Sequence, residues 1–160
     1  MFFQVVKAKG LEGIVAKHSQ SPYRMGKRSR QWPKIKTQLT QEGVIAGFTE
    51  PQGGRKYFGS LVLGAYAGGK LVYIGHSGGG FAAETLKEIY ARLQPLIQPE
   101  CPFKIEPPSS TQVTWVKPQL VCEVTFAGWT EEGLMRHPVF SRLRQDKPAR
   151  EVGIEKPEEI

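Results

Sequence analysis

Alternation of apolar and polar residues dominates the chain beyond residue 40 and predicts short β-strands. Three consecutive strands are expected, at residues 43–50, 57–67 and 70–76. Gly59 and Gly64 are candidate bend or bulge positions in the second strand, because glycine weakens a strand interior. The Gly68-Gly69 pair indicates a tight hairpin turn before the third strand.

A helical period follows these strands. Within residues 82–97, apolar side chains recur at spacings of three and four and share one helical face, namely Leu86, Ile89, Tyr90 and Leu93. A proline-rich linker over residues 95–108 leads to two further strands, at 111–117 and 119–127. Three strands, a helix between strands 3 and 4, and two more strands are the order of an OB-fold, a five-stranded Greek-key barrel that binds oligonucleotides. Because other small barrels also fit this order, the pattern by itself predicts a mainly β fold.

The first 36 residues follow a different pattern. A short helix over residues 2–9 ends at Gly10, and strands at residues 12–17 and 32–36 bracket a polar, basic segment that we expect to be an exposed loop. The change from basic loop to compact β structure places a domain boundary near residues 37–41. We therefore predict three parts, at residues 1–37, residues 38–152 and a flexible acidic tail over residues 153–160.

Basic residues are concentrated in the first of these parts. Residues 1–36 contain nine of the 22 Lys and Arg residues and one of the 15 acids, whereas the whole chain has a formal net charge of +7. This distribution is typical of a surface that binds a polyanion such as nucleic acid. The candidate DNA-binding cations are Arg24, Lys27, Arg28 and Arg30 of the basic loop, together with Arg55 and Lys56 of the first barrel turn.

Composition narrows the class of protein further. The sequence has no apolar run near the ~20 residues of a membrane span and no signal-peptide pattern, so we expect a soluble protein without a membrane partner. The two cysteines, Cys101 and Cys122, have no Cys or His neighbour at the spacing of a zinc site. We expect them to be reduced thiols.

Two of the strand-like runs carry residues suited to phosphate chemistry. Alternation places Lys34 and Lys36 on one face of a strand, where a nucleotide phosphate would relieve their mutual repulsion. Strand pairing would bring Glu12 alongside them. A carboxylate at that place would hold a divalent metal ion that bridges to the phosphate.

Two stretches of the sequence resemble motifs of a known enzyme family. EGIVAK at residues 12–17, followed by R-S-x-x-W-x-K-x-K at residues 28–36, resembles nucleotidyltransferase motifs IV and V of the ATP-dependent DNA ligases, in particular the ligase module of bacterial ligase D. Near the C-terminus, RHPVFSRLRQDKPAREV resembles motif VI of the same family, with Arg144 and the Asp146-Lys147 pair in the motif's positions.

The resemblance implies a part of an ATP-dependent DNA ligase, made of the end of the adenylation domain and the whole OB-fold domain. Such an enzyme seals nicks in duplex DNA through lysyl-AMP and DNA-adenylate intermediates, in DNA repair by end joining and in recombination, with ATP and Mg²⁺ or Mn²⁺ as cofactors. The implied site residues are Glu12 as metal ligand, Lys34 and Lys36 on the AMP phosphate, and Arg144 with Lys147 on the departing pyrophosphate. The implied location is the bacterial cytoplasm, in association with the nucleoid.

This chain departs from the family pattern in three ways. The family's nucleophilic lysine lies in a Lys-x-Asp-Gly motif, and this sequence lacks that motif because its single aspartate, Asp146, is followed by Lys147. We therefore expect no self-adenylation by the chain alone, and we expect it to work with an N-terminal adenylation segment in cis or in trans. Further expected partners are nicked duplex DNA and end-joining factors. The other two departures are Arg142, where glycine is more common, and Gln145, where an acid is common; the first bears on the backbone geometry of the motif.

Two other functions remain open from the sequence. A non-catalytic OB-fold DNA-binding module would use the basic residues for affinity alone, but it would have no use for motif VI. An RNA capping or RNA ligase relative would share motifs IV and V, yet GVIAGFTEP and WVKPQLVCEV look like bacterial DNA ligases. The glycine-rich SGGGF at residues 77–81 lacks the Gly-Lys-Ser/Thr of a P-loop, so we interpret it chiefly as a tight connection, with DNA backbone contact as a second role.

Overall fold

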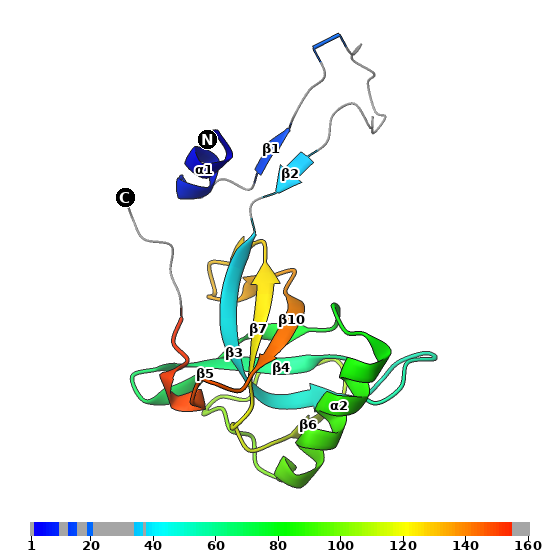
Figure 1. The fold of residues 1–160 in the computed structure, drawn as a ribbon. Coiled ribbons are helices and arrows are strands. Elements are labelled where there is room, and N and C mark those ends of the chain that lie inside the picture. Colours follow the sequence, from blue (N-terminus) through cyan, green and yellow to red (C-terminus); the bar gives the residue numbers. More distant parts are fainter. Residues whose placement is uncertain (1, 10–12, 16–18, 21–33, 37, 155–160) are drawn as a thin grey trace. The chain divides into compact units, whose positions relative to one another are not determined.

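The computed structural model of the chain describes residues 2–9, 13–15, 19–20, 34–36 and 38–154. The chain divides into two compact units, Met1–Gln38 with Lys156–Ile160, and Leu39–Glu155. Figure 1 traces the chain through both units. Among the described residues, none of the helices has the length and hydrophobicity to cross a lipid bilayer.

The first unit contains a short helix and a two-stranded hairpin. The helix, α1, spans Phe2–Ala8. Strands β1 (Gly13–Val15) and β2 (Lys34–Lys36) pair antiparallel, with Gly13 opposite Lys36. The expected helix and both expected strands are confirmed over the residues that the structure describes.

The second unit is mainly β and has the OB-fold arrangement (Figure 1). Its barrel elements are β3 (Leu39–Thr49), β4 (Leu61–Ala67), β5 (Lys70–Ser77), α2 (Ala83–Leu93), the 3₁₀ turn η1 (Gln94–Leu96), β6 (Val113–Trp115) and β7 (Val121–Phe126), followed later by β10 (Val139–Arg144) and the 3₁₀ turn η2 (Ala149–Glu151). The sheet order is β10-β7-β3-β4-β5, with β6 paired to β3. Three strands, a helix and two strands follow in the expected order, so the predicted fold class is confirmed.

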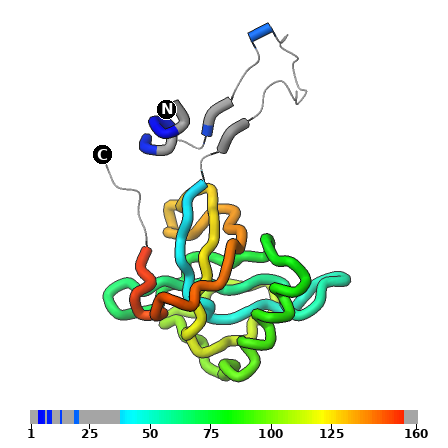
Figure 2. Tube along the Cα trace, viewed as in Figure 1, coloured from blue at the N-terminus to red at the C-terminus, as the bar shows by residue number. Residues whose placement is uncertain are grey.

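Strand β3 serves both halves of the barrel because it bends partway along its length (Figure 2). Residues 39–44 pair with β7, whereas the second half of the strand pairs with β4 and β6. The register shifts between Ile45 and Gly47. A Cβ on Gly47 would lie 2.8 Å from the carbonyl oxygen of Thr114 on β6, so glycine is what lets these two strands approach each other.

The β4–β5 hairpin follows the glycine pattern of the sequence. Gly68 and Gly69 have φ values of +59° and +78°, as a two-residue hairpin turn requires. The pairing register shifts between Leu63 and Gly64, which confirms the expected irregularity at that glycine.

The barrel core is closed by the apolar face of α2. Ile89 and Leu93 are fully buried, and Leu86 and Tyr90 pack against the core, so the predicted helical face is confirmed. Cys122 on β7 is also fully buried, and burial raises the pKa of its thiol to about 12. Both cysteines are free thiols, as expected.

The sequence pattern does not predict three of the strands. β8 (Gly128–Trp129) and β9 (Met135–Arg136) form a hairpin whose strands have two residues each, which is too short for alternation to be visible. β10 pairs with β7 and adds a further strand to the sheet. Only Phe140 on β10 is buried, so this strand lacks the apolar face by which strands are recognised in a sequence.

The glycine-rich connection after β5 packs against the beginning of β10. Gly79 forms a parallel bridge with Val139, and its carbonyl oxygen accepts a 3.0 Å hydrogen bond from the Phe140 amide. The rings of Phe81 and Phe140 stack with their centroids 4.6 Å apart. The expected tight connection is confirmed, and it contacts the beginning of β10, a strand that lies within motif VI.

Candidate functional site

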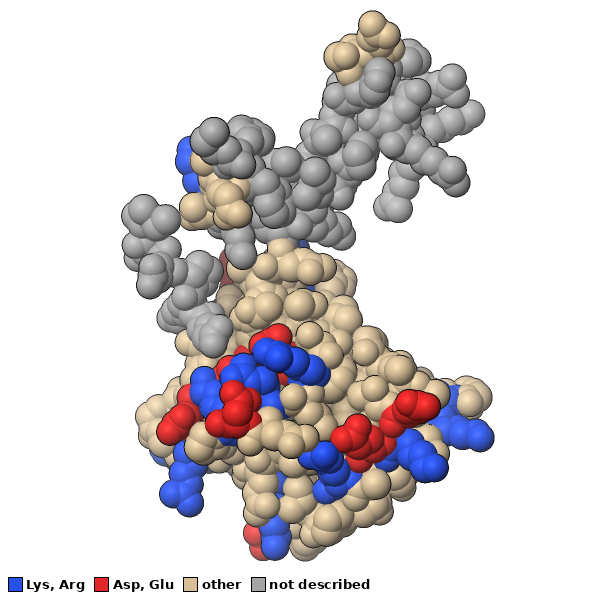
Figure 3. Space-filling view, in the orientation of Figure 1, with Lys and Arg blue, Asp and Glu red and all other residues tan. Residues whose placement is uncertain are grey.

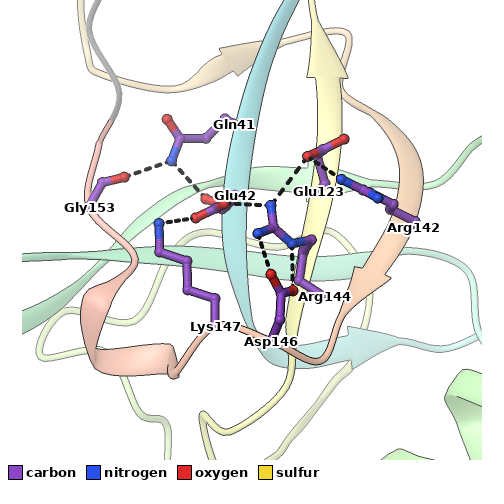
Figure 4. A network of polar contacts seen from close by, with 8 residues as sticks. All are labelled: Gln41, Glu42, Glu123, Arg142, Arg144, Asp146, Lys147 and Gly153. Carbon is purple, nitrogen blue, oxygen red and sulfur yellow. Dashed lines mark hydrogen bonds and ion pairs between the residues drawn. The ribbon is translucent and has the colours of Figure 1, made fainter.

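Six charged side chains meet across β3, β7 and β10 (Figure 4). This motif VI cluster consists of three acids and three bases, Glu42, Glu123, Asp146, Arg142, Arg144 and Lys147. Strand register accounts for the meeting, because Glu42 on β3 lies opposite Glu123 on β7, and Glu123 lies opposite Arg142 on β10. Two opposed carboxylates repel each other unless cations lie close to both. The opposed carboxylates of Glu42 and Glu123 therefore need the bases of the cluster close to them.

Arg144 is the centre of the cluster. Its Nη1 donates a 2.7 Å hydrogen bond to Oε1 of Glu42 and lies 3.6 Å from Oε2 of Glu123. On the other edge of the guanidinium, Nε and Nη2 each donate a 2.9 Å hydrogen bond to the carboxylate of Asp146. These hydrogen bonds to Asp146 are the largest cause of a raised pKa of Arg144, and the charges of Asp146, Glu42 and Glu123 add to it. The guanidinium is thus fixed in orientation along both edges.

Glu42 bridges the two bases of motif VI. Its Oε1 accepts the hydrogen bond from Arg144, and its buried Oε2 forms an ion pair with Nζ of Lys147. The side chain of Glu42 is 11% exposed, and that of Lys147 is 27% exposed. One carboxylate therefore holds two cations that come from a different part of the chain.

Sequence reasoning did not select Glu42 or Glu123 as site residues. A usable signal was present for Glu42, because it directly precedes a predicted strand with the apolar run Val44, Ile45 and Ala46. An acid that leads into a buried strand needs a paired base, since an unpaired carboxylate is costly to bury. Motif VI supplies that base.

The segment after Lys147 is fastened to the barrel. Val152 is fully buried, and its carbonyl oxygen accepts a 2.7 Å hydrogen bond from the amide of Tyr66 on β4. Nε2 of Gln41 donates a 2.8 Å hydrogen bond to the carbonyl oxygen of Gly153. Because β10 is paired with β7 on the other side, motif VI is held at both ends and belongs to the barrel.

The departure from the family pattern at Arg142 is compatible with an ordinary backbone. Arg142 follows a register shift in the pairing of β10 with β7, its side chain is 63% exposed, and its Nη2 lies 3.5 Å from Oε2 of Glu123. Of the described non-glycine residues, Tyr57 and His137 have positive φ and Arg142 does not. No glycine-like conformation is needed at this position.

Asp146 offers a pH test of the cluster. Its hydrogen bonds from Arg144 lower the pKa of the Asp146 carboxyl from 3.8 to about 2. Because the native pKa is the lower one, the pair contributes stability above about pH 4, and this contribution is lost as the pH falls toward about 2. We expect the Asp146 carboxyl signal in NMR to titrate near pH 2 in the native chain and near its ordinary value in an Arg144→Gln variant. A midpoint near the ordinary value in both proteins would contradict the two-pronged contact.

The other expected phosphate-binding residues lie in the first unit. Lys34 and Lys36 are the first and last residues of β2. The structure therefore places Lys34 with Lys36 in one unit, and Arg144 with Lys147 in the other. The remaining candidates of the first unit fall outside the described residues, namely Glu12, Arg24, Lys27, Arg28 and Arg30.

The turn after β3 contains the other two DNA-binding candidates, Arg55 and Lys56. Nη1 of Arg55 donates a 2.6 Å hydrogen bond to the carbonyl oxygen of Gly78, and its guanidinium carbon lies 5.7 Å from the centroid of the Phe81 ring. Arg55 thereby supports the glycine-rich connection, whereas Lys56 is exposed. On the face drawn in Figure 3, the acids and bases of the second unit are interspersed.

The described part of the chain contains no group of three or more His, Cys, Asp and Glu residues that could hold a metal ion. The acids of the motif VI cluster are each paired with a base. The expected metal ligand, Glu12, lies outside the described residues.

Family models match both parts of the chain. Residues 1–36 match the model of the ATP dependent DNA ligase domain, and residues 54–147 match that of the ATP dependent DNA ligase C terminal region. The second match alone covers more than half of the 160 residues.

Individual proteins support the same family. The chain is 46% identical over 153 residues to the multifunctional non-homologous end joining protein LigD of Pseudomonas aeruginosa, and the match covers 92% of this chain and 18% of that protein. The LigD of Mycolicibacterium smegmatis is 40% identical over 150 residues, which cover 92% of this chain and 20% of that protein.

Solved structures agree with these sequence matches. The crystal structure of the ligase domain of LigD from M. tuberculosis matches with a TM-score of 0.71 and 37% identity, and a mycobacterial DNA ligase D complexed with ATP and MES matches with a TM-score of 0.66 and 36% identity. Each match covers 96% of this chain and 50% of the solved chain. This chain thus spans half of those structures and a smaller share of the curated relatives. By its matched residues and its fold, the chain belongs to the ATP-dependent DNA ligase family.

Proposed function

We propose that this chain supplies the C-terminal part of an ATP-dependent DNA ligase that seals nicks in duplex DNA through lysyl-AMP and DNA-adenylate intermediates. The observation that carries the proposal is the pair of motif VI bases, Arg144 and Lys147, held together on Glu42. Cations fixed in this way stabilise the charge that develops during nucleotidyl transfer. The end-joining names of the relatives support a role in DNA repair and recombination, with end-joining factors as partners.

Arg144 and Lys147 bind the outer phosphates of ATP on this proposal, and they stabilise the departing pyrophosphate. The donors suit that task, because the outer edge of Arg144 already holds a two-oxygen anion, the Asp146 carboxylate, in the fork geometry that phosphate oxygens also match. Lys147 adds a point charge beside this fork.

The first unit supplies the remaining contacts to the nucleotide on this proposal. Lys34 and Lys36 bind the AMP phosphate, and Glu12 is a ligand of Mg²⁺ or Mn²⁺. When bound, the metal ion neutralises charge on the phosphates. The reactive lysine comes from an adenylation segment in cis or in trans, because the sequence contains no Lys-x-Asp-Gly.

The proposed organisation has three parts. Residues 1–37 are the end of the adenylation domain, residues 38–152 are the OB-fold domain, and residues 153–160 are a C-terminal tail, of which residues 155–160 lie outside the described residues. The proposed location is the bacterial cytoplasm, in association with the nucleoid, where the substrate is nicked duplex DNA.

DNA binding tests the role of the basic loop. Each phosphate contact contributes about 0.9 to the slope of log affinity against log salt concentration. We expect Ala substitution of Arg24, Lys27, Arg28 and Arg30 together to reduce the slope for nicked duplex by about 3 to 4. Fluorescence anisotropy over a salt series measures it.

A matched control removes the same number of cations from exposed positions of the second unit, at Lys70, Lys87, Lys104 and Lys117. This variant should change the slope by less than about 1. Equal losses in the two variants would contradict a specific role for the basic loop.

The same assay separates a ligase from a plain OB-fold binding module, because a ligase fragment should prefer nicked duplex over single strands of equal length.

A further inference from the structure

We propose that Glu42 is the positioning residue of motif VI, the group that sets the spacing and orientation of Arg144 and Lys147 for phosphate binding. This inference rests on the proposed function of those two bases. It adds to motif VI a residue that comes from the first barrel strand, 102 positions earlier in the chain than Arg144.

Glu42 contacts both bases of motif VI at once, and we call it their shared anchor. Its two oxygens are divided between the two cations, with Oε1 on Arg144 and Oε2 on Lys147. A carboxylate is a rigid group, so the distance between its oxygens limits how far apart the cations can lie. The Glu42 side chain is 11% exposed and stands on a strand paired with β7, so it has little freedom to move (Figure 4).

The two edges of the Arg144 guanidinium face different surroundings. The Nη1 edge points to Glu42, whereas the Nε and Nη2 edge points to Asp146, whose side chain is 71% exposed. An anion that arrives from solvent reaches the Asp146 edge first. The Glu42 contact lies behind it, where it can hold the guanidinium in place while the outer edge exchanges partners.

If Glu42 acted only through its negative charge, its neutralisation would have the opposite effect on anion binding. Each acid in the motif VI cluster also weakens the attraction of the bases for an anion, so neutralising any of them should strengthen anion binding. Glu123 provides the matched comparison, because it lies opposite Glu42 and 3.6 Å from the same Nη1 of Arg144. Glu42→Gln and Glu123→Gln remove the same charge, but only the first removes the shared anchor of Arg144 and Lys147.

The test is a titration of the full 160-residue chain with inorganic pyrophosphate, followed by NMR. We expect Glu42→Gln to weaken pyrophosphate binding about tenfold, the scale of one charge-assisted hydrogen bond. Glu123→Gln should bind as tightly as the unmodified chain or more tightly. Backbone amide spectra of the free proteins confirm that both variants are folded.

A second variant keeps the charge and changes only the reach. Glu42→Asp shortens the side chain by one methylene group, so a pure charge effect predicts unchanged binding, whereas positioning predicts weaker binding. This variant also serves if Glu42→Gln does not fold. Pyrophosphate binding by Glu42→Gln or Glu42→Asp that equals or exceeds that of the unmodified chain would overturn the proposal.

The Nε–H signal of Arg144 separates this inference from the proposed function. If the unmodified chain binds pyrophosphate no better than an Arg144→Ala variant, the phosphate-binding role fails. The positioning role of Glu42 is then tested on the protein without pyrophosphate. There, the Nε–H signal of Arg144 should shift in Glu42→Gln and keep its position in Glu123→Gln. Equal shifts in the two variants would overturn the anchor as well.

Discussion

The Gly80→Ala variant is expected to lose about 3 kcal/mol or more of unfolding free energy, the sum of backbone strain and overpacking at one position. Gly80 has φ of +90°, a conformation that residues with a Cβ rarely adopt. A Cβ there would lie 2.2 Å from the carbonyl oxygen of Phe140 and 2.8 Å from Cγ1 of Val139. Since one of these atoms belongs to the backbone of β10, relief requires the strand to move.

Gly79→Ala is the matched control for this substitution. The neighbouring glycine has no positive φ, and its added Cβ would meet no atom within 4 Å. We expect a change within about 1 kcal/mol, as for an unstrained substitution without a clash. Urea denaturation of both variants measures the difference. Similar stabilities would contradict the account in which the glycine-rich connection holds the beginning of β10.

The Arg144→Ala variant is expected to slow AMP transfer about 100-fold when the chain is combined with an adenylation segment that carries the nucleophilic lysine, the usual cost of removing one fixed group that stabilises the transition state. Arg144 is 20% exposed in its side chain and has contacts with three acids, so its guanidinium is held in one orientation. The rate of adduct formation in single turnover measures the loss.

Arg142→Ala is the control, because it removes the same residue type two positions earlier on the same strand. Its side chain is 63% exposed and its ion pair with Glu123 is longer, at 3.5 Å. Exposed pairs of this kind contribute little, so the rate should stay within about twofold. Equal losses in the two variants would mean that the net charge of the motif VI cluster, and not the position of Arg144, determines the rate.

Local sequence patterns predict much of the fold. Alternation located the barrel strands, and the helical spacing of Ile89 and Leu93 identified the face of α2 that is fully buried. The Gly68-Gly69 turn was readable because positive φ at two successive positions favours glycine strongly. These features depend on neighbours within a few residues, which is why a sequence reveals them.

The features that escaped prediction depend on distant partners. β10 is a strand because it pairs with β7, although only one of its side chains is buried. Glu42 can be a buried acid because it pairs with Arg144, which lies 102 positions later in the chain. Arg55 was selected for its charge, but its contact with the Gly78 carbonyl oxygen depends on how two turns pack. Motif resemblance found Arg144 and Lys147, but only the three-dimensional arrangement connects them to Glu42.

On the proposed function, this chain contributes motif VI but no nucleophile to a DNA ligase. The most direct measurement is incubation with radiolabelled ATP and Mg²⁺, followed by a denaturing gel that separates this chain from an added adenylation segment containing Lys-x-Asp-Gly. We expect no label on this chain, and label on the segment that appears faster when this chain is present. A covalent AMP adduct on this chain alone would contradict this expectation, because one of its own lysines would then be the nucleophile.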